Sequence, residues 1–126
     1  MSIEVRTVFC DDIRREDNGK AILIGVYTGD LIPNQLPGSF PISLWLDIRG
    51  LKAGAYEVKI SLDFPSEAKL SVPGRIEVDD PSQPVTMMIS GLPASVTSAG
   101  TITATIEIDG RKIPAGSLIV RSPLKQ

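Results

Sequence analysis

Alternation of apolar and polar residues with a period of two constrains this chain more than any other feature of its sequence. The clearest run is residues 56–64, in which every second residue is aromatic or aliphatic and the residues between them are charged or carry a hydroxyl. Residues 42–49, with Trp45 as the exception, and residues 101–108 follow the same pattern. Because successive side chains of a strand point to opposite faces, each run predicts a strand with one face in a core.

The remainder of the chain also favours strands. Together with the three clear runs, weaker ones bring the expected total to about eight strands; they are residues 4–10, 20–28, 75–79, 85–90 and 117–121. Ten prolines and eleven glycines lie mostly between these runs, and no substantial helix is expected. Short strands joined by turns are typical of antiparallel sandwiches. We therefore predict a single domain, residues 1–126, with an all-β, antiparallel two-sheet sandwich of immunoglobulin-like, Greek-key type.

Two prolines and one turn add detail to this prediction. Pro73 and Pro114 favour a sandwich over a closed barrel, because proline in a sheet is confined to edges and bulges. Asp109-Gly110 predicts a two-residue hairpin turn that sets Ile106 opposite Ile113. Pro114 then marks a bulge or an edge, and residues 118–120 either follow a bulge or are covered on both faces.

The composition excludes several kinds of chemistry. The chain has no histidine, which removes Ser-His-Asp and Cys-His catalysis and histidine-bound zinc. Its one cysteine, Cys10, cannot form an internal disulfide, and we expect an inert, buried thiol because Asp11 and Asp12 disfavour the thiolate. We therefore expect no metal site, no cofactor and no enzymatic activity.

Charge and the N-terminal residues bear on partners and location. The net charge is −2 with both signs interspersed, so neither nucleic acid nor an anionic membrane is an expected partner. The first residues lack the pattern of a signal peptide, and no apolar run approaches the roughly 20 residues that span a bilayer. These features predict a cytoplasmic protein.

The densest charge lies in residues 10–20, where seven of eleven residues are charged, and it leads into the pair Asn18-Gly19. A two-residue type I′ turn at this pair sets Asp17 opposite Lys20 and Ile13 opposite Ile24. That register places Asp11 on an apolar face, which it shares with Phe9, Ile13, Arg15, Ile22, Ile24 and Val26.

A carboxylate on an apolar face must be paired, hydrogen-bonded or protonated. Three interpretations of Asp11 stay open. It is a structural carboxylate bound by backbone amides or by Arg15; it belongs to a solvated loop because the ladder ends before it; or it is a functional group with a perturbed pKa.

This hairpin also carries a resemblance. Phe-Cys-Asp-Asp-Ile-Arg, the Asn-Gly-Lys turn and Ile-Gly-Val-Tyr-Thr-Gly-Asp resemble the opening of a family of small uncharacterised bacterial all-β domains, over residues 8–32. The resemblance implies a compact β domain. The family has no assigned activity, so no functional residue is carried over from it.

A possible binding surface follows from the same register. Leu23 and Tyr27 lie on the face opposite Ile24, and Trp45 alternates onto the polar side of its own strand. If the two strands are neighbours, these three side chains form an apolar patch of the kind that binds a protein, a second copy or a sugar. The alternative is that the loop of residues 31–40 covers them.

The sequence does not identify the function, and it leaves several hypotheses. The leading one is a non-enzymatic structural or protein-interaction module that binds a protein partner or associates with itself. The second is a carbohydrate- or small-ligand-binding module that uses the Trp and Tyr side chains. Two hypotheses rank lower. A calcium-binding C2-like domain would need an Asp-x-Asp-x-Asp loop, which this chain lacks, and a carboxylate hydrolase would need two acids at a defined separation.

Overall fold

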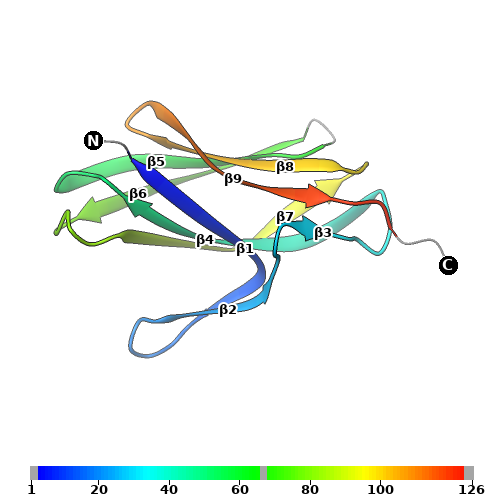
Figure 1. Ribbon diagram of the computed structural model, residues 1–126, viewed down its shortest axis with the longest axis horizontal. Helices are drawn as coiled ribbons and strands as arrows, with labels where there is room; N and C mark the ends of the chain where they lie inside the picture. The colour runs from blue at the N-terminus through cyan, green and yellow to red at the C-terminus, as the bar shows by residue number, and fades with distance from the viewer. Residues whose placement is uncertain (1–2, 66–67, 124–126) are drawn as a thin grey trace.

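The computed structural model describes residues 3–65 and 68–123, which form nine strands and no helix. The all-β prediction is confirmed, and the described residues contain nothing that would cross a membrane as a helix. The strands, labelled in Figure 1, are β1 (Glu4–Arg15), β2 (Ala21–Val26), β3 (Asp30–Leu31), β4 (Gly38–Arg49), β5 (Gly54–Asp63), β6 (Lys69–Val78), β7 (Val85–Val96), β8 (Gly100–Ile108) and β9 (Arg111–Val120).

The strands form two sheets of different kinds. The first has the order β2-β1-β4-β7 and is antiparallel throughout; the second has the order β3-β9-β8-β5-β6. In the second sheet β3 runs parallel to β9, with Asp30 beside Ile119 and Leu31 beside Val120. The expectation of wholly antiparallel sheets is therefore wrong at this edge. The chain leaves the first sheet after β2, and its next two-residue strand joins the second sheet in the direction of β9.

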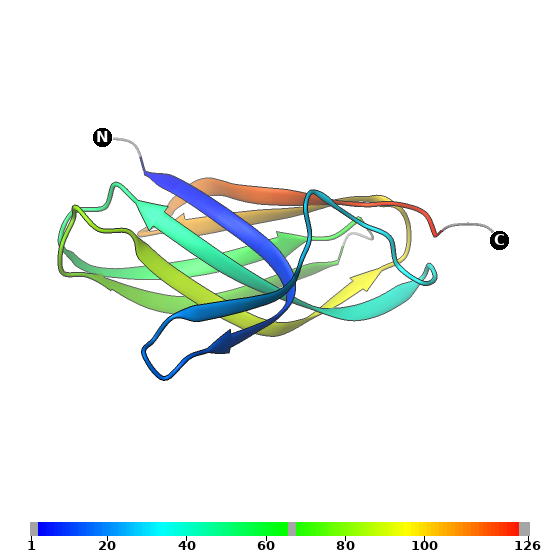
Figure 2. The same ribbon diagram turned by 60° about the horizontal axis from the view of Figure 1, so that its bottom comes forward.

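Buried residues from both sheets form one hydrophobic core. Figure 2 shows the two sheets from a second direction. The three strongest alternating runs supply the centre of this core as β4, β5 and β8, so their prediction is confirmed. Each fully buried aliphatic side chain contributes about 1.5–3 kcal/mol of transfer free energy. Those with almost no exposed surface include Ile42, Leu44, Leu46, Ile48, Ile60, Leu62, Ile102, Ile106 and Leu118.

The β8–β9 hairpin has the predicted register. Ile106 lies opposite Ile113, and the turn residues Asp109 and Gly110 have φ angles of 46° and 85°, as a type I′ turn requires. The ladder then shifts by one residue, because Thr105 pairs with Pro114 while Ala104 pairs with Gly116. Of the two alternatives for Pro114, a bulge or an edge, the structure has the bulge, and it returns Leu118 to the core. Pro73 lies on the edge strand β6, also as expected.

The β1–β2 hairpin has a different register from the predicted one. Ile13 pairs with Leu23 and Asp12 with Ile24, one residue away from the expected pairing of Ile13 with Ile24. The reason is the turn, which has three residues instead of two. The Glu16 amide donates to the Lys20 carbonyl (2.8 Å), and the Gly19 amide donates to the Glu16 carbonyl (2.9 Å).

This loop is a turn followed by a glycine bulge, and it requires positive φ only at Gly19 (87°). A shift of one residue reverses the faces of a paired strand. Ile22, Ile24 and Val26 therefore lie on the face opposite Ile13 and are exposed, so their predicted place on an apolar inner face is wrong.

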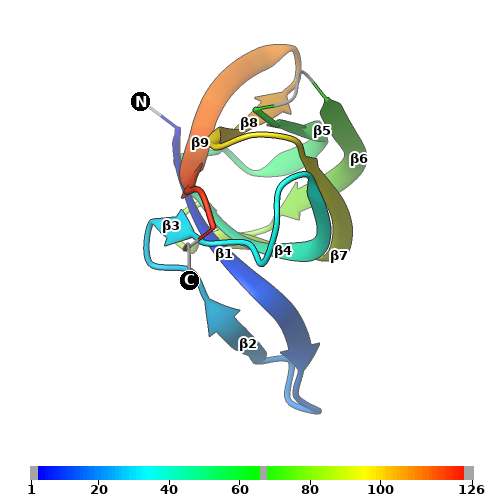
Figure 3. The same cartoon turned by 90° about the vertical axis from the view of Figure 1, so that its right-hand side faces the viewer.

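The hairpin also leaves the body of the protein. β1 pairs with β4 from Glu4 to Cys10, but its last residues pair with β2 alone. Figure 3 shows the resulting shape, in which the β1–β2 hairpin projects away from the two sheets.

Candidate interaction site on the projecting hairpin

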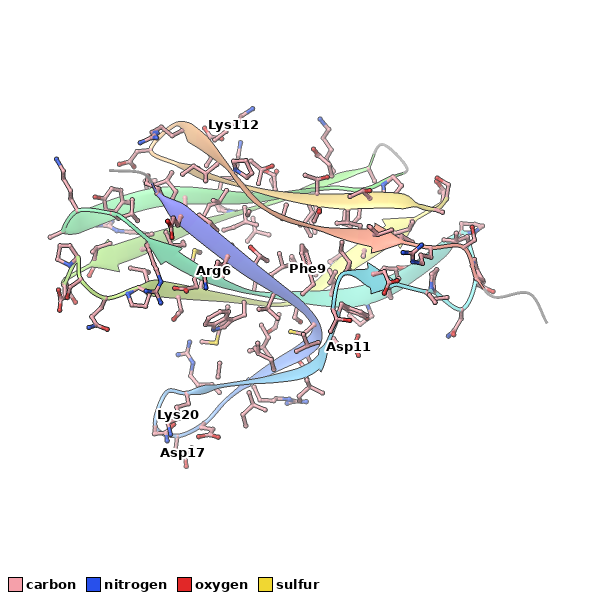
Figure 4. The ribbon with its side chains drawn as sticks, in the orientation of Figure 1. Arg6, Phe9, Asp11, Asp17, Lys20 and Lys112 are labelled. Carbon is pink, nitrogen blue, oxygen red and sulfur yellow. The ribbon has the colours of Figure 1, made fainter. Side chains whose placement is uncertain are left out.

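Asp11 lies at the point where β1 leaves the two sheets, between Phe9 in the body and Asp17 and Lys20 at the hairpin tip (Figure 4). Its side chain is exposed, so the prediction that it faces the core is wrong. The carboxylate lies across the backbone of Gly25, which has a φ of 68°. A Cβ atom at that position would come within 2.8 Å of Asp11 Cγ, so this approach requires glycine.

The partner of Asp11 is Tyr27 and not the expected Arg15. The Tyr27 hydroxyl donates a hydrogen bond to Asp11 Oδ1. The neighbouring carboxylate, Asp12, pairs with Arg14 (Nε to Oδ2, 2.9 Å), whereas Arg15 is exposed and has no ion pair with any described residue. The contact depends on the three-residue loop, which pairs Asp12 with Ile24 and thereby brings Asp11 beside Gly25 and diagonal to Tyr27.

This contact changes the acidity of the tyrosine. Burial raises the pKa of Tyr27 above its ordinary value of 10.0, and the hydrogen bond to the Asp11 carboxylate and the charge of that carboxylate raise it further. The neutral phenol is therefore the favoured form, and Tyr27 acts here as a hydrogen-bond donor that holds the end of β2 against the bend in β1.

Cys10 and Ser43 fix the other side of the bend. Cys10 has no exposed surface, and burial, followed by the charges of Asp11 and Asp12, raises the pKa of its thiol. The buried Ser43 hydroxyl donates to the Asp11 carbonyl (3.3 Å) and accepts from the Gly91 amide (3.1 Å). It thereby ties β1 to β4 and β7, next to the shift in the β4–β7 ladder.

The structure divides the predicted patch of Leu23, Tyr27 and Trp45. Leu23 and Trp45 line one groove of about 480 Å³, where β2 stands over the outer face of β4 and β7; Thr86 and Met88 complete its apolar floor. Tyr27 lines a separate cavity of about 460 Å³ with the loop of residues 31–40. The loop expected to cover the whole patch therefore covers only Tyr27.

The most exposed apolar surface of the described residues includes a stripe that the sequence analysis placed in the core. Ile22, Ile24 and Val26 are 43%, 45% and 48% exposed and lie at alternate positions of β2. We call these three residues the β2 stripe. They went unrecognised because the predicted register was one residue off, and the length of the hairpin loop was the missing information.

Acidic residues do not assemble into a metal site in the described part of the chain. No three Asp, Glu or Cys side chains there lie close enough together to hold a metal ion. Asp47 is an unexpected case, because it is only 7% exposed although it lies on the outer face of β4. Its Oδ2 accepts from Arg49 Nε (3.3 Å), and its Oδ1 has no hydrogen-bond partner among the residues that the structure describes.

Comparison with known proteins identifies a family but no activity. Residues 6–121, nearly the whole chain, match the family described as "Family of unknown function (DUF6941)". No curated protein and no solved structure matches the chain.

Proposed function

Because this chain belongs to DUF6941, a family of unknown function, we propose a role from its surfaces: it is a non-enzymatic protein-interaction domain that binds through the β1–β2 hairpin. The observation that carries this proposal is the β2 stripe. Three branched aliphatic side chains, each nearly half exposed, lie side by side on an element that projects from the body. Apolar side chains scattered singly over a surface need no explanation, but contiguous ones on a protruding element indicate an interaction site.

The hairpin is also built to hold its position. Tyr27 and Asp11 join the end of β2 to the bend, and Ser43 joins the bend to β4 and β7. On the inner side, Ile13 is only 8% exposed and Leu23 contributes to the groove above Trp45. A rigid hairpin loses little conformational entropy on binding, which favours association.

We further infer that the two sheets form an immunoglobulin-like sandwich. In this fold strands A, B and E are neighbours in one sheet and strands C, F and G in the other. The orders β1-β4-β7 and β5-β8-β9 correspond to these sets. The β1–β2 hairpin is then an addition at the first edge, on a frame that often serves recognition. We place the protein in the cytoplasm, in keeping with its single buried thiol.

The test compares two matched lysine substitutions. Ile24→Lys interrupts the β2 stripe, and Ile119→Lys introduces the same charge at an equally exposed isoleucine (44%) on β9. Each tagged protein is used for affinity capture from extracts of the cells that produce it. The wild type and Ile119→Lys should retain the same proteins, and Ile24→Lys should lose them. Identical capture by all three proteins would refute the role of the hairpin.

A second candidate is small-ligand or carbohydrate binding in the groove beside Trp45. The observation in its favour is the groove itself, with an indole on its wall and an apolar floor. Titration of sugars followed by Trp45 fluorescence tests this candidate, because Trp45 is the only tryptophan in the sequence. An unchanged spectrum across a panel of mono- and oligosaccharides would eliminate carbohydrates as ligands.

A further inference from the structure

We propose that the partner of the β2 stripe is a second copy of this chain, bound by antiparallel pairing of the two β2 edges about a two-fold axis at Ile24. This inference rests on the proposed function, because it names the partner of the same hairpin. The product would be one continuous sheet that crosses the dimer, with the two stripes merged on one of its faces.

The first argument is the contrast between the sheet edges. Exposed edge strands invite pairing, and proteins protect them with proline, charge or short length. β6 has Pro73 and alternating charged residues, β7 contains Pro93, and β3 has only two residues. β2 is the fourth edge, and its sequence Ala-Ile-Leu-Ile-Gly-Val contains neither proline nor charge. Of the four edges, it alone has neither a proline, nor a charged residue, nor a length of only two residues, and its one irregular position is Gly25 with a φ of 68°.

The second argument is that the stripe is complementary to itself. Antiparallel pairing centred on Ile24 sets Ile24 against its own copy and Ile22 against Val26 in both directions. A register one step to either side places one stripe residue of each copy opposite Lys20 or Thr28 instead. Only the centred register pairs all three residues with one another, and β-branched side chains pack well as cross-strand neighbours.

The third argument concerns charge and strength. In the centred register Lys20 lies opposite the uncharged Thr28 of the copy, so no like charges meet. Six residues of strand on each side bury less surface than the roughly 1,200 Å² at the lower limit of stable interfaces. We therefore expect a weak, reversible dimer with a dissociation constant of about 100 µM.

The first experiment is sedimentation velocity on the full chain from about 10 µM to about 1 mM. Wild type and Ile119→Lys should shift from monomer to dimer across this range, and Ile24→Lys should remain a monomer at every concentration. Far-UV circular dichroism should give the same strand spectrum for all three, which excludes unfolding as the cause.

The second experiment tests the register by cysteine substitution. At the two-fold axis the Cα atoms of paired residues lie about 4.5–5.5 Å apart, within the range that a disulfide accepts. Ile24→Cys should therefore form an intermolecular disulfide under mild oxidation much faster than Ile22→Cys, which faces Val26 of the copy. The native Cys10 is buried and does not compete.

The outcomes separate this inference from the proposed function. Self-association is overturned if the wild type stays monomeric at every concentration and Ile24→Cys forms disulfides no faster than Ile22→Cys. If affinity capture still depends on Ile24 in that case, the hairpin binds a different protein and the proposed function stands. If capture is also independent of Ile24, both fail.

Discussion

The two hairpins that close on glycine, β1–β2 and β8–β9, have different loops although their turn sequences look equivalent. Asp109-Gly110 forms the two-residue turn that an X-Gly pair predicts, with both residues at positive φ. Asn18-Gly19 belongs instead to a three-residue loop in which only the glycine has positive φ. The same dipeptide signal therefore gave the right register in one hairpin and the wrong register in the other.

The difference lies in what the flanking strands bury. Ile106 and Ile108 on β8 are buried in the core, so a slip by one residue would turn them to solvent. The outer half of the β1–β2 hairpin has charged residues on both faces of β1 and exposed aliphatics on β2. Ile13 is the one buried residue there, so burial constrains the register only weakly and the local geometry of the turn decides it.

The largest expected effect compares two isoleucines, one in each hairpin. Ile106→Ala removes a side chain with no exposed surface and should lower the free energy of unfolding by about 2–5 kcal/mol. Ile24→Ala, at a position 45% exposed, should cost less than about 0.5 kcal/mol in the monomer. Urea denaturation at low protein concentration measures both. Equal losses would mean that the projecting hairpin shares the core's stability.

The next effect concerns the contact between Asp11 and Gly25. Gly25→Ala introduces a Cβ at positive φ and displaces the Asp11 side chain, so we expect a loss of about 2 kcal/mol. In Asp11→Ala/Gly25→Ala the collision is absent, and the double variant should be more stable than the sum of the single losses predicts. Strict additivity in urea denaturation would show that the two residues do not touch.

A smaller effect is expected at alkaline pH. Folding raises the pKa of Tyr27 above 10.0, so the stability that it contributes is complete below pH 10 and decreases as the pH rises above that value. Tyr27→Phe should cost about 1 kcal/mol at pH 8, the typical net value of a hydrogen bond and less than that of a buried charged one, because Asp11 is exposed.

Thermal melts at a series of pH values test this assignment. Above pH 10 the difference in melting temperature between wild type and Tyr27→Phe should decrease, because only the wild type loses the tyrosine contribution. Tyr56→Phe serves as the matched control. A gap between wild type and Tyr27→Phe that widens at high pH would contradict the raised pKa.

The smallest effect tests the loop itself. Deletion of Asp17 leaves Asn18-Gly19 as a two-residue turn between Glu16 and Lys20, which keeps the observed pairing of Ile13 with Leu23. We expect a change in stability within about 0.5 kcal/mol and unchanged exposure of the β2 stripe. Amide hydrogen exchange along β2 provides the measurement. Faster exchange of the amides that pair with β1 would show that the third loop residue is needed for the register.

Sequence reasoning succeeded where burial imposed a period of two. β4, β5 and β8 were recognised as strands, and the Asp109-Gly110 register followed from the turn and kept Ile106 and Ile113 on one face. A bulge was one of two alternatives for Pro114. It failed at Asp11, whose partner is Tyr27 and not the predicted Arg15. It also failed at the parallel strand β3, which has too few residues to form a pattern.

The sequence alone thus determined that the chain folds as an all-β domain with its core on β4, β5 and β8, because only a two-residue period keeps these side chains out of water. The tertiary structure decided the loop length at Asn18-Gly19, and with it the exposure of Ile22, Ile24 and Val26. The physical reason is that the outer half of the hairpin buries only Ile13, which is too little to fix its register. The binding surface proposed for this protein therefore lies in the part of the chain whose strand register the hydrophobic pattern does not determine.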